Sequence, residues 1–364
     1  MSAIPADRAA TFEAPDEFEA INRIYRERRW SDGLPIVPPT AARVERMLRE
    51  TRRGRDEVIA IVAPGFGAAT VERIAINAVL AGCDPEYLPV LIAATQAVAD
   101  PAFNLQGIQA TTNSVAVWLV INGPLAQRLQ VNATFNCIGQ GAWANATLGR
   151  GIRLILQNIG GALPGEMDRA THGQPGKYSF CCAENEEGHP WQPLHVERGF
   201  VATDSTVTVV GAEGTMNMNT HAKTADELAR VIAETMVHPP SNEYVHGGEP
   251  WFIIGSEHAE IFRREGWDKA RLKRELWQRS KMAVKHLSVN EIERARASRT
   301  PELGPLSDDT LLPISPSPED IQLIVAGGPG THSVYVPCFG NSRAVTRRIE
   351  SWQTSLLGGF HISI

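Results

Sequence analysis

The stretch SVAVWLVING, residues 114–123, decides the fold, because it is a short apolar run that ends at a glycine. Such runs are typical of strands. PLAQRLQ (124–130) follows directly and predicts a helix. A strand with a glycine turn recurs at WFIIGSEH (251–258) and IQLIVAGGPGTHS (321–333). We therefore expect an α/β fold with a mixed or largely parallel sheet and flanking helices.

Apolar residues at helical spacing predict further helices around these strands. They cover residues 16–30, 40–50, 142–158 and 225–237. A helical segment at 256–297 is rich in Lys, Arg and Glu, and we expect it to form a solvated hairpin that could dock a partner. Short apolar runs predict strands at 57–62, 177–183 and 204–210. PGFGAAT (64–70) is expected to be a glycine turn that opens a helix and presents its N-terminal amides to an anion.

One segment divides the chain by composition. HPPSNEYVHGGEP, residues 238–250, is rich in proline and glycine and predicts a linker. We expect a main α/β domain over 1–237 that carries the site, and a second α/β lobe over 251–364 closely packed on it.

Composition limits the classes of partner. The 364 residues are 43% hydrophobic and carry a net charge of −6 without a basic stripe, so nucleic acid is not an expected partner. Because no apolar run reaches about 18 residues, no membrane partner is expected either. The first 20 residues do not resemble a secretory signal, and the five cysteines suggest no disulfide framework. We expect a cytoplasmic protein that forms a homo-oligomer.

The chain is most dense in reactive side chains between Gly139 and Arg198. This segment contains three histidines, two adjacent cysteines and five glutamates: His172, His189, His195, Cys181, Cys182, Glu166, Glu184, Glu186, Glu187 and Glu197. Histidine moves protons near neutral pH, and carboxylates orient or stabilise it. The candidate catalytic residues are His172, Glu184, Glu186, His195 and Cys181. In a strand, Cys181 and Cys182 would face opposite sides.

Substrate binding is expected from residues on both sides of this segment. Asn145 and Arg150, on the predicted helix, form a donor-rich pair for an anionic group. The other candidates are Lys177, Tyr178, His332 and Ser333, the last two directly after the glycines of GGPGTHS (327–333).

Cofactor binding stays open at this stage. His172 and His195 are candidate ligands for a divalent metal, zinc or iron, with Glu184 as an oxygen donor. They do not follow an HExxH spacing, however. PGFGAAT contains neither a GxGxxG fingerprint nor a P-loop lysine, so no dinucleotide site is expected.

Several motifs occur together between Trp30 and Ile349: DGLPIVPPT, INAVLAGCDPEYLPV, ANATLGR, ATHGQPGKYSFC, AENEEGHPWQPLHVERGF and GGPGTHS. In this combination the chain resembles an uncharacterised bacterial protein family whose genes are associated with UGSC-type selenoproteins. The resemblance implies a whole-chain unit, linked by gene neighbourhood to thiol or selenium redox metabolism. It supplies no catalytic residues. This chain has no UGSC or CxxC sequence, which argues against direct redox catalysis.

The residues favour an enzyme that acts on a small, anionic organic substrate. Its acid/base chemistry would be of the hydrolase or lyase type, with or without a metal. Two alternatives remain: a non-catalytic subunit or scaffold of a thiol or selenium redox complex, and a cysteine-dependent enzyme that uses Cys181 or Cys182.

Overall fold

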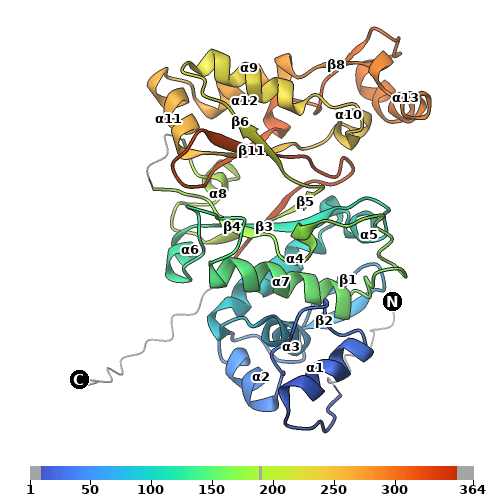
Figure 1. The fold of residues 1–364 in the computed structure, drawn as a ribbon, viewed down its shortest axis with the longest axis vertical. Coiled ribbons are helices and arrows are strands. Elements are labelled where there is room, and N and C mark those ends of the chain that lie inside the picture. The colour runs from blue at the N-terminus through green and yellow to red at the C-terminus, as the bar shows by residue number, and fades with distance from the viewer. Residues whose placement is uncertain (1–9, 188–190, 351–364) are drawn as a thin grey trace.

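The computed structural model describes residues 10–187 and 191–350, and two four-stranded sheets face each other at its centre (Figure 1). The first sheet contains, in order, β12 (Val345–Arg348), β5 (Thr206–Ala212), β3 (Ala116–Asn122) and β4 (Cys181–Ala183). The second contains β10 (Gln322–Val325), β7 (Trp251–Ile254), β11 (His332–Val336) and β6 (Met216–Asn219). Helices cover the outer face of each sheet, which gives four layers.

Strand β3 is buried along its whole length because both of its faces are covered. Val117, Leu119 and Ile121 point to the outer helices, whereas Trp118 and Val120 point to the second sheet, as strand alternation requires. The helices on this side are α1 (Phe18–Glu27), α2 (Ala41–Leu48), α3 (Val71–Ala81), α4 (Leu88–Val98), α5 (Leu105–Gln109) and α7 (Trp143–Asn158). Of these, α4 and α7 pack on the sheet, and α3 packs on both of them.

The second sheet is covered mainly by α9 (Ala225–Met236), α11 (Ser256–Arg264) and α12 (Lys269–Arg279). Phe252 and Tyr335 point to these helices, and their rings stack with centroids 5.1 Å apart. Helices α10 (Asn242–His246) and α13 (Val289–Leu303) pack together, and β8 (Met282–Ala283) pairs with β9 (Leu311–Leu312).

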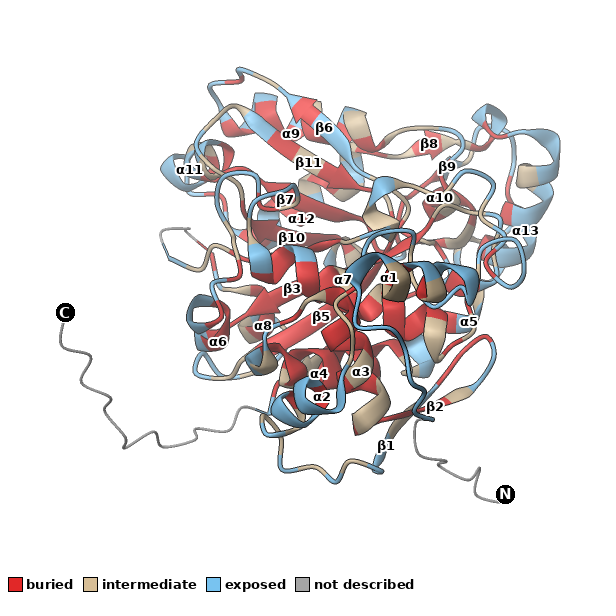
Figure 2. Ribbon diagram, turned by 60° about the horizontal axis from the view of Figure 1, so that its bottom comes forward, coloured by how far each residue is buried: buried red, intermediate tan, exposed pale blue. Residues whose placement is uncertain are grey.

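An apolar layer joins the two sheets. Trp118 meets Trp251 edge to face, with ring centroids 5.6 Å apart, and stacks on Phe180 at 5.2 Å. Figure 2 shows β3, β5, β7 and β10 as buried, whereas β6 at the edge of the second sheet is largely exposed. The short helix α8 (Leu194–Glu197) enters this layer beyond the end of β3 and contributes Leu194. Helix α6 (Pro124–Arg128) directly follows β3. The polar end of this layer is where the candidate site lies.

The predicted α/β class with a mixed sheet is confirmed. Parallel pairing occurs between β3 and β4 and between β10 and β7, and the other pairs in the two sheets are antiparallel. The prediction for PGFGAAT is wrong, because these residues do not open a helix directly. β1 (Val58–Val62) and β2 (Gly67–Thr70) form an antiparallel hairpin, and α3 begins only at Val71. A Cβ on Gly67 would lie 2.0 Å from the Ile159 carbonyl oxygen, so this glycine serves close backbone packing.

The chain passes from one sheet to the other before and after the predicted linker, and not at the linker itself. β6 and α9, which precede residues 238–250, belong to the second sheet and its helices. β12 returns near the end of the described chain to pair with β5 of the first sheet. Strand pairing over long distances in the sequence determines which elements belong to each sheet. Local composition does not indicate that pairing.

No single helix within residues 10–187 and 191–350 is both long and apolar enough to cross a membrane. One bent pair of helical segments, Pro85–Val98 with Pro101–Gln109, passes the length and composition criteria only when joined across a 73° bend. Leu88, Leu91 and Ile108 from this pair are buried in the core on the helix side of the first sheet.

Candidate active site between the two sheets

The polar segment that the sequence groups together is divided between the two ends of β3. His172 is exposed near the start of the strand, where the neighbouring Thr171 N–H donates to the Thr112 carbonyl oxygen at 2.9 Å. Glu184 lies at the other end, where its N–H donates to the Ile121 carbonyl oxygen at 3.2 Å. Seven strand residues span about 20 Å. The structure therefore does not bring His172 together with Glu184.

The side chains of Asn145 and Arg150 both make contacts that stabilise the fold. The Asn145 side chain bonds only to backbone groups, at 2.7 to 3.2 Å, and these belong to Asn132, Cys137 and Cys181. Arg150 makes a bidentate ion pair with Asp32, at 2.7 and 2.8 Å, and thereby holds the loop that follows α1. The two side chains do not form the expected anion-binding pair, because their hydrogen-bonding groups already have partners within the protein.

Lys177 and Tyr178 do not converge on a site either. The Lys177 Nζ lies 2.8 Å from both carboxylate oxygens of Asp168. Burial lowers the pKa of Lys177, and Asp168 opposes that shift. Tyr178 is 52% exposed. The charge of Lys177 is therefore neutralised within the fold.

His332 and Ser333 lie at the start of β11 and have separate environments. His332 is exposed, and its Nδ1 lies 3.2 Å from the Asn217 side-chain oxygen. Ser333 is buried, where its Oγ accepts the Gly255 N–H at 3.0 Å and lies 2.7 Å from His258 Nδ1. Ser333 thus ties β11 to the start of α11.

The two adjacent cysteines face opposite sides of β4, as predicted. Cys181 is in the core on the helix side, and Cys182 is in the layer between the sheets. Burial raises the pKa of Cys181 far above its ordinary value. Because the thiolate is the nucleophile, the surroundings of Cys181 argue against its predicted catalytic role.

Glu184 and Glu186 are held side by side at the end of β3. The Asn122 Nδ2 donates to Glu184 at 2.7 Å and to Glu186 at 2.9 Å. Two backbone amides add to this, from Leu194 to Glu184 at 2.8 Å and from Gly123 to Glu186 at 2.7 Å. Burial raises the pKa of Glu184 against the opposing charge of a lysine and these hydrogen bonds. Glu184 is therefore a carboxyl group that tends to keep its proton, and it lies next to the more exposed Glu186.

His195 completes this cluster from α8. Its side chain is fully buried, and within the described residues neither ring nitrogen has a hydrogen-bond partner. Nδ1 lies 3.8 Å from the Glu186 carboxylate, which is beyond hydrogen-bonding distance. The Asn122 Oδ1 and the Thr206 Oγ1, which face each other across β3 and β5, are also buried without a partner. Each such group costs about 1–3 kcal/mol, so their gathering at one place calls for a functional explanation.

Two buried lysines approach the cluster from α12. The Lys269 Nζ lies 3.0 Å from Glu197 and 3.9 Å from Glu184, and Lys273 also pairs with Glu197. Burial raises the pKa of Glu197, but the two lysines more than offset this and leave it below its ordinary value. The prediction of a solvated hairpin over 256–297 is therefore wrong for this face of α12, because the lysine stems pack inward while their charges are paired.

Sequence reasoning missed four residues of the cluster: Asn122, Thr206, Lys269 and Lys273. Asn122 had a weak signal, since it is a polar residue at the end of an apolar run. The lysines had none, because a Lys pair four residues apart in a charged helix is typical of an exposed face.

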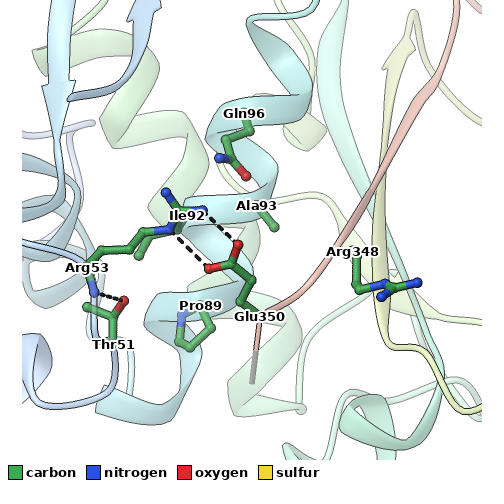
Figure 3. Close-up of a pocket in the computed structure, with 8 residues that line it drawn as sticks. All are labelled: Thr51, Arg53, Pro89, Ile92, Ala93, Gln96, Arg348 and Glu350. Carbon is green, nitrogen blue, oxygen red and sulfur yellow. Dashed lines mark hydrogen bonds and ion pairs between the residues drawn. The ribbon is translucent and has the colours of Figure 1, made fainter. Parts of the chain in front are cut away.

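The surface pocket in Figure 3 lies elsewhere, between α4, the loop before β1 and the end of β12. Arg53 bonds to Glu350 at 2.8 and 3.2 Å, and Arg348, which also lines the pocket, pairs with Asp204 at 2.7 Å. The α4 residues Pro89, Ile92 and Ala93 form its apolar wall. Its lining contains no histidine or cysteine, and we assign no chemistry to it.

Metal binding has no assembled site in residues 10–187 and 191–350, where no group of three or more His, Cys, Asp or Glu is placed to hold an ion. The predicted ligands His172 and His195 lie toward opposite ends of β3 and would not share one metal. His189 is outside the described residues. No family model, curated protein or solved structure matches the chain.

Proposed function

We propose that the chain is an enzyme that acts on a small organic substrate by acid/base chemistry of the hydrolase or lyase type. The observation that carries this proposal is the buried His195 ring, 3.8 Å from Glu186 and beside the Glu184–Glu186 pair. Neighbouring groups with different proton affinities are what general acid/base catalysis needs.

The surroundings suggest a role for each side chain. Glu184, whose pKa is raised by burial, would donate a proton to the leaving group. Glu186 and His195 would remove a proton, from water in a hydrolase or from a substrate carbon in a lyase. Asn122 Oδ1 and Thr206 Oγ1 would accept hydrogen bonds from substrate. Glu186 is 25% exposed whereas Glu184 and His195 are buried, so substrate would enter past Glu186.

The proposal that the substrate is anionic rests on a lysine of α12. Arg150 and Lys177, expected from the sequence to bind an anion, are paired with Asp32 and Asp168. Among the described residues, Lys269 is the cation that lies near the proposed acid, 3.9 Å from Glu184. We propose that Lys269 binds the negatively charged group of the substrate and, in doing so, loses part of its ion pair with Glu197.

We further propose that the enzyme works in the cytoplasm as a homo-oligomer without a nucleic-acid or membrane partner. Five free cysteines, all buried, support the cytoplasmic location, and the net charge of −6 supports the absence of a nucleic-acid partner. Light scattering during size-exclusion chromatography measures the oligomeric state, and a monomer would contradict that part.

The test of the catalytic proposal uses two neighbouring glutamates. The purified chain is assayed on a panel of carboxylic esters, amides and hydroxy acids, and the best substrate is used to compare Glu186→Gln with Glu187→Gln. Glu187 is the matched control, because it is exposed and bonds to Gln127 at the surface. We expect kcat to fall at least about 100-fold in Glu186→Gln and to change little in Glu187→Gln. Equal activity of both variants would refute the assignment.

A further inference from the structure

A second polar pocket lies at the start of β3, at the opposite end of this strand from the proposed active site. It is enclosed by α5, α7, the first residues of β3 and the short helical turn η3 (Pro175–Lys177). The polar side chains that line it are Gln109, Arg153 and Lys177. Two of the sequence motifs, ANATLGR and ATHGQPGKYSFC, meet here and had no place in the proposed catalytic cluster.

The cations at this pocket outnumber the carboxylates that they contact. Both oxygens of Asp168 lie 2.8 Å from the Lys177 Nζ, and one of them lies 3.5 Å from Arg153. The neighbouring carboxylate, Asp32, makes a bidentate pair with Arg150 at 2.7 and 2.8 Å. Three cations therefore share two carboxylates among the described residues, and Arg153 makes the longest of these ion pairs.

The Arg153 side chain is only 11% exposed. Its guanidinium donates to the Ala162 carbonyl oxygen at 2.7 Å and to the Gln109 Oε1 at 3.2 Å, both of which are neutral acceptors. Burial lowers the pKa of Arg153, and the charges of Asp168 and Asp32 only partly offset this effect. Because a buried charge is costly unless an opposite charge lies close to it, an anion in the pocket would be stabilised by Arg153.

Gln109 adds a hydrogen-bond donor next to this charge. The residue is 4% exposed, and its contact with Arg153 fixes the orientation of its amide, since an arginine only donates and must face the oxygen. Within residues 10–187 and 191–350, the Gln109 Nε2 then has no hydrogen-bond partner. No Asp or Glu lines the pocket. Its polar lining therefore offers donors and positive charge, which is what an anion needs.

We propose that this pocket is a binding site for a small carboxylate, with Arg153 and the Gln109 Nε2 as its ligands. The walls beside these groups are apolar and include Ile152 and Leu156, which suits the carbon body of an organic anion. The empty space is about 260 Å³ and includes the opening to solvent, so the ligand has few heavy atoms. The site does not depend on the proposed acid/base function, because it lies at the other end of β3.

The balance of charges predicts how the site responds to substitution. Lys177 pairs with Asp168 and so keeps this carboxylate from neutralising Arg153. Removal of either cation would leave equal numbers of positive and negative charges, and anion binding would weaken. Asp168→Asn would instead add to the excess of positive charge and strengthen binding. A cluster that only stabilises the fold would bind no anion in any of these variants.

The test measures the binding of acetate to the full chain by saturation-transfer NMR, with acetamide as a neutral ligand of the same shape. We expect saturable binding of acetate, no binding of acetamide, and no displacement by an equal concentration of chloride. The Kd of acetate should rise at least about tenfold in Arg153→Met and in Lys177→Met, and should fall at least about threefold in Asp168→Asn. Arg169→Met is the matched control and should bind as the wild type does, because Arg169 is exposed and outside the pocket lining.

Three results would overturn the proposal. One is a wild-type chain that shows no saturable binding of acetate. Another is equal binding of acetamide, or displacement of acetate by an equal concentration of chloride. The third is an unchanged Kd in both Arg153→Met and Lys177→Met, which would place acetate elsewhere, for example at Lys269. The wild-type titrations decide the first two, so the proposal remains testable if a variant fails to fold.

Discussion

Each end of β3 holds a pair of glutamates that are buried or half-buried, and the two pairs differ in the hydrogen bonding of their neighbours among the described residues. At the start of the strand, Glu213 accepts hydrogen bonds from Asn113 at 2.7 Å and from Asn242 at 2.8 Å. Next to it, Glu243 accepts the Tyr335 hydroxyl and a backbone amide. This pair closes the layer between the sheets and has its hydrogen bonds within the fold.

At the other end, Glu184 and Glu186 share Asn122, while His195 and Thr206 next to them have buried polar atoms without a partner among the described residues. Both ends therefore contain acidic groups in a low dielectric, and burial raises the pKa of Glu184 as it raises that of Glu243. A perturbed carboxyl group alone does not distinguish a structural pair from a site. The unpartnered groups around it do.

The largest expected effect separates the two ends by their histidines. His195→Asn should reduce kcat by about 10²- to 10⁴-fold, because it removes a group able to transfer a proton. His172→Asn, at the exposed other end, should leave kcat within about twofold. Steady-state kinetics on the best substrate of the panel measures both, with circular dichroism to verify folding. A loss of activity in His172→Asn equal to that in His195→Asn would break the comparison.

A second prediction concerns the pH dependence of stability at the structural end. Burial raises the pKa of Glu243 from 4.5 to about 8. Between these values the carboxyl group keeps its proton in the folded chain but loses it in the unfolded chain. Its stabilising contribution is therefore complete below about pH 4.5 and is lost as the pH rises through about 8. This amounts to roughly 5 kcal/mol, at about 1.4 kcal/mol per pKa unit.

Glu243→Gln tests this contribution, because glutamine does not titrate. Relative to the wild type, the variant should gain stability between pH 5 and pH 8. Urea unfolding, followed by tryptophan fluorescence at several pH values, measures the difference. Glu187→Gln, exposed and outside both pairs, should leave the pH profile unchanged. A constant difference between Glu243→Gln and wild type over this range would mean that Glu243 is ionised in the folded chain.

Much of the fold could be predicted because its signals are local. The periods that predict helices at 40–50, 142–158 and 225–237 correspond to α2, α7 and α9, and Thr40 caps α2 as its sequence position suggests. The pairing of β6 with β11 and of β12 with β5 could not be predicted. Those contacts depend on strands that are far apart in the chain, and single-sequence periodicity contains no register between them.

The candidate site shows the same limit. The sequence singled out Glu184, Glu186 and His195 as polar residues in a turn-rich segment, and the structure brings them together. It also grouped His172 with them, because closeness in sequence was the only measure available. A buried strand separates residues that are near in sequence, and α12 brings Lys269 to the site from far along the chain.

The smallest expected effect compares the two asparagines that hold the acidic pairs. Asn122→Ala removes a donor shared by two carboxyl groups and should cost about 2–3 kcal/mol of unfolding free energy, since both groups lose a hydrogen bond. Asn242→Ala removes one of the two side-chain donors to Glu213 and should cost about 1 kcal/mol, because Asn113 remains. Urea unfolding at neutral pH gives both values. If Asn122→Ala costs no more than Asn242→Ala, one amide does not hold Glu184 and Glu186 together, and the proposed acid/base pair loses its support.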